Sequence, residues 1–294
     1  MTEQDLARAI GESIDATLQS EPAERVHGGC INKCYRWESS AGPIFVKVAE
    51  AAAGDMLHAE AAGLEALRKA GAVRVPRVLG VAGGADTQWL ALEWIPLRKP
   101  SAKSESTLGE RLSVQHRSSV AAFGWHRNNT LGSSPQINDW SDNWVEFFRE
   151  RRLRRQLDLA RSNGHGGRLQ QRGETLLGLV DRFFNHAQVL PSLLHGDLWG
   201  GNWAVDERGA PVLFDPAVYF GDREADIAMT RLFGGFGANF YAAYHASWPL
   251  ADGAENRVAL YNLYHVLNHL NLFGGGYLGQ AISSIDRLLG ELGH

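Results

Sequence analysis

Three side chains with acceptor oxygens, Asp197, Asn202 and Asp215, stand out in residues 193–216, a stretch rich in apolar residues and glycine. Asp197 and Asn202 lie five positions apart in His-Gly-Asp-Leu-Trp-Gly-Gly-Asn, and Asp215 follows the apolar run Val-Leu-Phe. The turn Asp-Glu-Arg-Gly separates two short apolar segments between them, which predicts a β-hairpin. Such a hairpin folds Asp215 back towards Asn202, so we expect the three groups to meet in space.

These three groups fit the needs of phosphoryl transfer, in which a protein orients a hydroxyl and neutralises charge on the moving group. An Asp five residues before an Asn, followed by a second Asp, is the spacing of a kinase catalytic loop. Asp197 would accept or orient the hydroxyl proton, while Asn202 and Asp215 would offer oxygens to Mg²⁺. The alternative is a polar loop beside a buried hairpin, with Asp197 as a turn residue.

Composition excludes several classes of protein. The 294 residues are 44% hydrophobic, enough for a sizeable core in one or two domains. The net charge of −4 argues against broad nucleic-acid binding. We find no apolar run of about 18 residues, so we expect no transmembrane helix. The N-terminus lacks the order of a signal peptide, and two cysteines suggest a reducing compartment, so we expect a cytoplasmic protein without membrane partners.

The N-terminal region combines a helix with a glycine-containing turn. Apolar residues recur every fourth position over 2–18, which predicts a helix. The segments 24–26 and 34–38 then bracket a turn. Backbone amides after two glycines can cover the phosphates of a nucleotide, although a plain hairpin turn explains the pattern equally well. The candidate nucleotide-binding residues of this turn are Gly28, Gly29, Cys30, Ile31 and Asn32.

A lysine and a glutamate upstream form a candidate ion pair. Residues 44–49 are typical of a strand, and Lys47 is their one charged member. Helical spacing over 55–70 places Glu60 on the apolar, inward face, where a carboxylate needs a cation. Lys47, as a phosphate-binding lysine, is the expected partner. Alternatively, Lys47 lies at a sheet edge and Glu60 in solvent.

Two more strands, at 78–82 and 88–92, would complete a sheet of about five strands. An extended crossing follows, where the backbone of Glu93 and Ile95 can bind an adenine edge. We place the lobe boundary near residue 98, because the segment after it is polar. The expected organisation is an N-terminal nucleotide-binding lobe, 1–98, and a helical lobe, 99–294, that carries the catalytic and metal-binding loop.

Helices dominate the second part of the sequence. Asp226 opens a helix that ends near Phe233, where it either caps the helix or holds the catalytic loop in place. Five arginines follow one another closely within 149–155, and interspersed acids suggest a solvated, salt-bridged face rather than a phosphate site. The other expected helices cover 112–125, 144–160 and 169–186, with further amphipathic helices to the C-terminus.

The chain resembles the fructosamine kinase (ketosamine 3-kinase) family, within the aminoglycoside phosphotransferase-like branch of protein-kinase folds. Residues 28–32, 135–140, 195–216 and 263–277 carry the likeness, which spans nearly the full length. It implies a two-lobed α+β protein-kinase-like fold, with a small antiparallel sheet lobe containing one inward-facing helix. It also implies ATP, Mg²⁺ and phosphorylation of the 3-hydroxyl of ketosamines, on free amines or glycated protein lysines, as a deglycation repair. In that resemblance Trp199 is the platform for the sugar, or else a buried aromatic anchor.

The motif also departs from protein kinases, because His195-Gly196-Asp197 lacks an Arg and Asp215 is followed by Pro216. Two alternative functions are a kinase for another hydroxylated amine, such as an aminoglycoside or choline, and a pseudokinase interaction module. Intact Lys47 and Asp197 argue against the pseudokinase. Cys30 is either an inert thiol or a residue whose oxidation blocks the nucleotide site.

Overall fold

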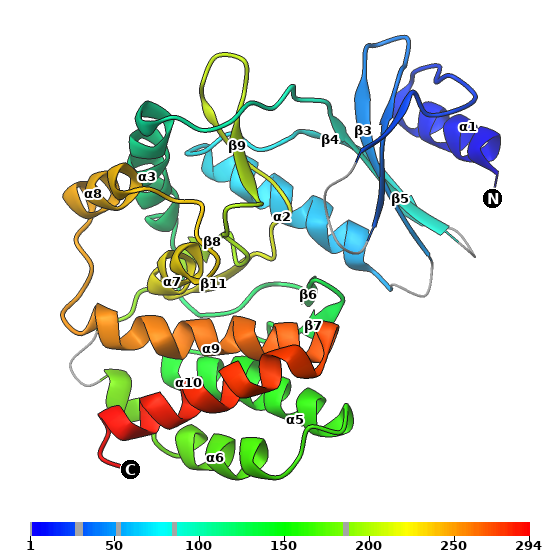
Figure 1. The fold of residues 1–294 in the computed structure, drawn as a ribbon. Helices are drawn as coiled ribbons and strands as arrows, with labels where there is room; N and C mark the ends of the chain where they lie inside the picture. Colours follow the sequence, from blue (N-terminus) through cyan, green and yellow to red (C-terminus); the bar gives the residue numbers. More distant parts are fainter. Residues whose placement is uncertain (1, 27–31, 51–53, 84–86, 185–187) are drawn as a thin grey trace.

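The computed structural model describes residues 2–26, 32–50, 54–83, 87–184 and 188–294. Its N-terminal part is a five-stranded antiparallel sheet in the order β1-β2-β3-β5-β4, and the remainder is mostly helical (Figure 1). This is the predicted α+β, two-lobed kinase-like architecture. The strands of the sheet are β1 (Glu24–Val26), β2 (Lys33–Trp37), β3 (Ile44–Glu50), β4 (Val78–Gly83) and β5 (Thr87–Glu93).

The sheet lies between two helices, and strand alternation divides its side chains between them. Helix α1 (Glu3–Ile14) buries Leu6 and Ile10 against Val46 on one face. Helix α2 (Met56–Ala70) covers the other face, towards which Lys47 points beside its cross-strand partner Leu90. Thus an apolar strand presents a lysine to α2 without exposing it.

Helix α1 is shorter than predicted, because the chain leaves the helical conformation at Asp15 (φ +52°). Leu18, expected in the helix, forms a bridge with Ser39 instead. Helix α2 begins after Asp55 and ends at Gly71, whose positive φ of 67° suits a glycine, and its predicted bounds are confirmed.

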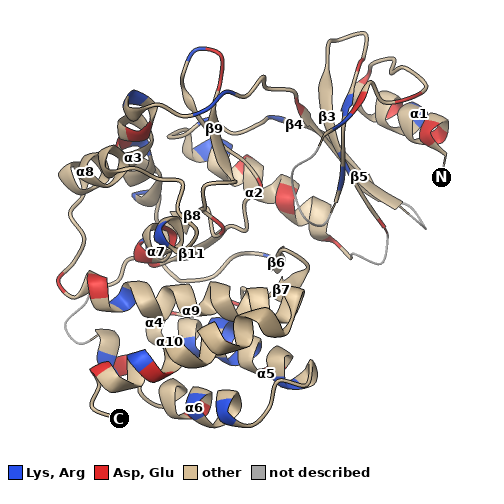
Figure 2. Ribbon diagram, in the orientation of Figure 1, with Lys and Arg blue, Asp and Glu red and all other residues tan. Residues whose placement is uncertain are grey.

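The second part contains most of the helices. They are α3 (Ala102–His116), α4 (Trp144–Phe147), the π-helix η2 (Phe148–Arg154), α5 (Arg155–Ser162), α6 (Arg168–Leu177), the 3₁₀ helix η3 (Val180–Phe184), α7 (Glu224–Leu232), α8 (Ala238–Ser247), α9 (Ala254–Phe273), the 3₁₀ helix η4 (Gly275–Tyr277) and α10 (Leu278–Glu291). Figure 2 shows basic and acidic residues interspersed on α6 and α10, where Arg168 and Arg172 pair with Asp286. Within the described residues, we find no helix with the length and apolarity needed to span a membrane.

The predicted helix over 112–125 is wrong in both bounds. Helix α3 begins earlier, in the polar stretch after the predicted lobe boundary, because Ser101 and Ser104 form a capping box there. It ends at His116, and the chain continues extended, with Gly124 bridging to Phe220. Likewise, the helix expected over 169–186 ends at Leu177 before the separate turn η3.

Three short ribbons complete the fold. The predicted hairpin is present as β9 (Trp203–Val205) and β10 (Pro211–Leu213). Two further ribbons were not predicted: β6 (Asn129–Leu131) with β7 (Ser134–Gln136), and β8 (Ser192–Leu194) with β11 (Tyr219–Gly221). The β8–β11 pair lies directly before and after the segment with Asp197, Asn202 and Asp215, and so brackets it.

Candidate active site

Lys47 is the centre of a cluster of charges from three elements. Its Nζ lies 2.6 Å from Oε1 of Glu60 on α2 and 2.6 Å from Oδ1 of Asp215 after β10. Only 4% of Lys47 is exposed. Burial alone would lower the pKa of Lys47, but the carboxylates of Asp215 and Glu60 outweigh it and raise the pKa. The predicted Lys47–Glu60 pair is confirmed, and Lys47 stays charged.

Asp197 and Asn202 lie together in the loop between β8 and β9. Asn202 donates its Nδ2 to the backbone carbonyl of Asp197 (2.8 Å) and to Oδ2 of the same residue (3.1 Å). The backbone N–H of Phe214 donates to the Asn202 carbonyl, which holds the segment with Asp215 beside this loop. Burial and the nearby Asp215 carboxylate raise the pKa of Asp197 to about 7. The structure thus brings Asp197, Asn202 and Asp215 together as expected.

Backbone geometry fixes the loop that bears Asp197. Gly196 has φ +83°, and a Cβ on it would lie 2.1 Å from the carbonyl oxygen of Ala217. Therefore only glycine fits between His195 and Asp197. His195 is fully buried, its Nε2 lies 3.0 Å from the Phe214 carbonyl, and burial lowers its pKa. A neutral imidazole thus fixes the residue before Asp215.

The side chain of Asp226 holds this loop through hydrogen bonds to its backbone. Its carboxylate accepts the backbone N–H groups of His195 (2.7 Å) and Gly196 (2.9 Å), and it lies 3.1 Å from Nε2 of His116 on α3. It lies inside the first turn of α7, whose N-cap is Arg223 and has no side-chain cap. The capping role proposed from sequence is therefore wrong, and the loop-holding role is confirmed.

The segment after β5 is more enclosed than expected. The Glu93 side chain pairs with Arg74 at 2.7 Å, and Arg74 also reaches Asp206 in the β9–β10 turn at 2.5 Å. Ile95 is only 7% exposed. Arg98 then forms a bridge with Val205, so this segment attaches the sheet to the hairpin.

Most of the predicted glycine-containing turn, namely Gly28, Gly29, Cys30 and Ile31, lies outside the described residues. Asn32 is described, and it lines a cavity of about 440 Å³ between α1 and the sheet. Cys34 is a cross-strand neighbour of Lys47, and burial raises the pKa of its thiol to about 11. At neutral pH this thiol is protonated.

Trp199 lies on the surface beside Asp197, with 38% of the residue exposed. The alternative of a buried anchor is therefore wrong. Its ring meets Phe233 edge to face at 6.3 Å, and Phe233 lies 4.7 Å from the His269 ring. Sequence reasoning missed both partners. The signal that would have pointed to Phe233 is a second aromatic-Gly-Gly sequence, Phe233-Gly234-Gly235, which repeats Trp199-Gly200-Gly201.

The motif at 135–140 acts as a buried amide network. Gln136 donates to Asn129 (2.8 Å) and to the carbonyl of Ala217 (3.0 Å), and Asn129 donates to the carbonyl of Val218. Asn138 accepts from Arg152 at 2.7 Å. These bonds hold the chain that follows Asp215. The family motif at 135–140 was recognised in the sequence, but its residue spacing does not indicate that it binds the backbone after Asp215.

The predicted solvated face of five arginines is wrong for Arg152. Arg149 and Arg154 do pair with Glu150 at the surface. Arg152 is fully buried instead, with its guanidinium 4.1 Å from the centroid of the Tyr219 ring.

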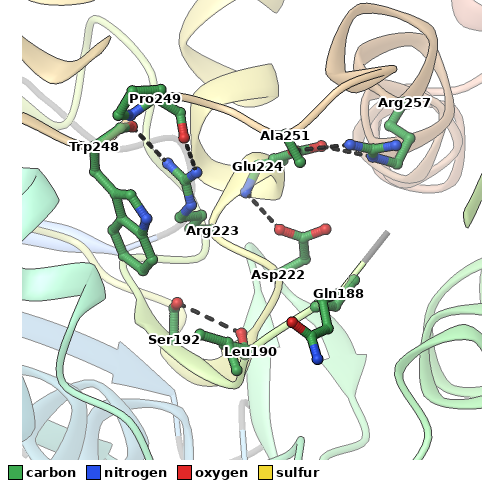
Figure 3. Close-up of a pocket in the computed structure, with 11 residues that line it drawn as sticks. Gln188, Leu190, Ser192, Asp222, Arg223, Glu224, Trp248, Pro249, Ala251 and Arg257 are labelled. Carbon is green, nitrogen blue, oxygen red and sulfur yellow. Dashed lines mark hydrogen bonds and ion pairs between the residues drawn. The ribbon is translucent and has the colours of Figure 1, made fainter. Parts of the chain in front are cut away.

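A second cavity, of about 240 Å³, lies where α7 and α9 begin (Figure 3). Arg223 donates there to the carbonyls of Trp248 and Pro249, and Arg257 pairs with Glu224 at 2.7 Å. Both guanidinium groups therefore already have protein partners. The residues that fit phosphoryl transfer lie instead around Lys47 and Asp197.

Comparison with known proteins agrees with this geometry. The chain is 41% identical over 287 residues to the probable ketoamine kinase of Synechocystis sp., covering 97% of this chain and 96% of that one. It is 42% identical over 268 residues to the chloroplastic protein-ribulosamine 3-kinase of Arabidopsis thaliana, covering 90% and 81%. A solved protein from Haemophilus somnus, provisionally named fructosamine-3-kinase, superposes with a TM-score of 0.87 at 27% identity, covering 97% and 96%. The profile described as Fructosamine kinase matches residues 2–291, so this chain belongs to the fructosamine kinase family.

Proposed function

We propose that this protein is an ATP-dependent kinase that phosphorylates the 3-hydroxyl of ketosamines on free or protein-bound amines. The observation that carries the proposal is the Lys47–Glu60–Asp215 cluster beside Asp197 and Asn202 in a member of this family. Relatives named for ketoamine and ribulosamine phosphorylation support the substrate class. A 3-phosphorylated ketosamine sheds its sugar, so the activity would repair glycated amines. The low cysteine content supports a cytoplasmic location for this repair.

Asp215 and Asn202 are the proposed magnesium ligands, and their remaining oxygens fit such an ion. Lys47 bonds Oδ1 of Asp215, which leaves Oδ2 for a cation. Asn202 donates its amide nitrogen to Asp197, so its amide oxygen is the remaining acceptor. Carboxylate and amide oxygens are the ligands that Mg²⁺ prefers. When bound, Mg²⁺ would neutralise charge on the phosphates.

Asp197 is the proposed catalytic base. A carboxylate with a pKa of about 7 is well matched to proton transfer near neutral pH. Asp197 would take the proton of the sugar 3-hydroxyl. The hydroxyl oxygen would then bond to the γ-phosphorus of ATP as the bond from that phosphorus to ADP breaks. Asn202 orients the carboxylate, and Trp199 offers an exposed indole face for the sugar C–H groups.

The nucleotide would lie between lobes 1–98 and 99–294. Lys47, held by Glu60, would bind its phosphates, and the backbone of Glu93 and Ile95 would face the adenine. The remaining proposed nucleotide contacts are the turn residues Gly28, Gly29, Cys30, Ile31 and Asn32.

The test is an ADP-release assay with ribulosamine, fructosamine, kanamycin and choline as acceptors. We expect turnover of a ketosamine, and a loss of about a hundredfold or more in Asp197→Asn. Asp181→Asn, an exposed Asp on η3, is the matched control and should retain wild-type rates. Turnover of only kanamycin or choline would reject the ketosamine assignment, and normal turnover by Asp197→Asn would remove Asp197 as the base.

A further inference from the structure

An exposed row of aromatic rings runs away from Asp197. Trp199 meets Phe233 at 6.3 Å, Phe233 meets His269 at 4.7 Å, and His269 meets Phe273 at 5.3 Å and Tyr277 at 5.2 Å. We call these five residues the aromatic strip. They come from the catalytic loop, the segment after α7, the end of α9 and η4, so the strip is assembled by the tertiary fold.

Close backbone contact builds the start of the strip. A Cβ on Gly200 would lie 2.8 Å from the Gly234 carbonyl oxygen, and one on Gly235 would lie 2.5 Å from Cα of Gly200. A Cβ on Gly201 would lie 2.3 Å from the Trp199 ring. These glycines let the indole lie flat on the loop and bring Phe233 against it.

Three of the five residues of the strip are open to solvent. Phe233 is 40% and Phe273 53% exposed, as is 38% of Trp199. His269 is half-buried, and burial lowers its pKa, so the row carries no positive charge at neutral pH. Neutral, electron-rich faces attract organic cations and hydrocarbon together.

A ketosamine carries both an organic cation and a hydrocarbon group on its amine side. Its amine is attached to C1, two carbons from the 3-hydroxyl, and is a secondary ammonium at neutral pH. If the 3-hydroxyl lies at Asp197 and the sugar lies on Trp199, the ammonium and its substituent project from C1 of the sugar next to Trp199. The neighbouring ring in the structure is Phe233.

Resting on the proposed function, we infer that the aromatic strip binds the amine side of the ketosamine. Trp199 and Phe233 would hold the ammonium by cation–π attraction, and His269, Phe273 and Tyr277 would cover the alkyl or aromatic group beyond it. The enzyme would therefore prefer ketosamines of long-chain or aromatic amines, including the four-methylene chain of lysine, over those of small amines.

The test compares two ribulosamines that differ only in the amine, methylamine and benzylamine. We expect wild type to favour the benzyl compound in kcat/KM, and Phe273→Ala and Phe233→Ala each to lower that preference about tenfold, mainly through KM. Phe233→Tyr should restore it. Val114→Ala, which removes an exposed side chain on α3, should leave the preference unchanged.

An unchanged preference in both Phe→Ala variants, with both compounds still turned over, would overturn the inference while the proposed function stands. Failure of the wild type on both compounds would instead reject the proposed function, and the inference with it. Calorimetric binding of the benzyl compound gives a readout independent of turnover. Equal affinity of Phe273→Ala and wild type would also overturn the inference.

Discussion

Asp226 and Asp222 allow one chemical change to be made at two buried sites with different expected results. Both carboxylates are nearly fully buried and lie four positions apart at the start of α7. Asp226 accepts the backbone N–H groups of His195 and Gly196. Asp222 accepts the Tyr261 hydroxyl at 2.5 Å and the Glu224 N–H at 3.0 Å. Replacing each Asp by Asn keeps the shape but turns one acceptor oxygen into a donor.

At Asp226 the change cannot be accommodated. Either orientation of the new amide places its NH₂ group against a backbone N–H, which leaves a buried donor unpaired at about 1–3 kcal/mol. Burial favours the neutral acid, yet hydrogen bonds from His116 and the Gly196 backbone outweigh it and hold the pKa of Asp226 below its usual value. The negative charge is therefore stabilised at this position, and removing it also loosens the loop bearing Asp197.

At Asp222 the change is better tolerated. The Tyr261 hydroxyl already accepts a hydrogen bond from Trp144 and has a second lone pair for the new NH₂ group, but its own proton must then turn away from residue 222. The amide oxygen still accepts the N–H of Glu224. Burial and the Glu224 carboxylate raise the pKa of Asp222 to about 6, so the negative charge is disfavoured there. Only the hydroxyl proton loses its partner, so the change should cost about 1 kcal/mol, less than the same change at Asp226.

Urea unfolding and steady-state kinetics of both variants test this reasoning. We expect Asp226→Asn to lower the free energy of unfolding by about 1–3 kcal/mol. Its kcat should fall by up to about a hundredfold, because a displacement of the base by about 1 Å costs that much. Asp222→Asn should lose less stability than Asp226→Asn, and its kcat should stay close to that of the wild type. Equal losses in the two variants, or a larger loss at 222, would refute the hydrogen-bond argument.

Two further predictions concern stability. Gly196→Ala should lower the free energy of unfolding by clearly more than the roughly 1 kcal/mol of a left-handed alanine, because its Cβ would lie 2.1 Å from a carbonyl oxygen. Gly209→Ala, at a similar φ but with no atom within 4 Å of the new Cβ, should lose only that roughly 1 kcal/mol. Similar urea midpoints for the two variants would contradict the predicted clash. Burial lowers the pKa of His265 to about 3, whereas a histidine in the unfolded chain has a pKa near 6.5. Below pH 6.5 the unfolded state therefore binds more protons than the folded state, and the free energy of unfolding should fall by about 1.4 kcal/mol per pH unit. His265→Asn should remove that slope between pH 6 and 4, and an unaltered slope would show that other groups cause the acid sensitivity.

The sequence predicted the features that arise from local periodicity and side-chain chemistry. The inward lysine of β3 and the inward glutamate of α2 follow from strand and helix periods, and their charges require each other. The hairpin between Asn202 and Asp215 follows from its turn residues. Helix α3 was misplaced because its first turns are exposed and carry no apolar period. The pair Ser101 and Ser104 was the available signal for its start.

Arg152 escaped prediction for a different physical reason. Seven residues of its helix adopt the wider π form, η2, in which hydrogen bonds span five residues. The buried pair Arg152 and Leu153 therefore follows the buried pair Phe147 and Phe148 by five residues. A helical wheel at 3.6 residues per turn assigns the wrong arginine to the surface. The aromatic rings and carbonyls that receive Arg152 come from distant segments.

Helix α7 connects the part of the site that sequence reasoning found with the part that it missed. Near its start, Asp226 binds the backbone at His195 and Gly196, directly before the proposed base. Just beyond its end, Phe233 and the glycines after it contact Trp199 and Gly200, directly after the base. One short helix thus holds the loop on both sides of Asp197. Because no local pattern encodes such a two-ended contact, only the tertiary structure relates the position of the base to the aromatic surface proposed to select its substrate.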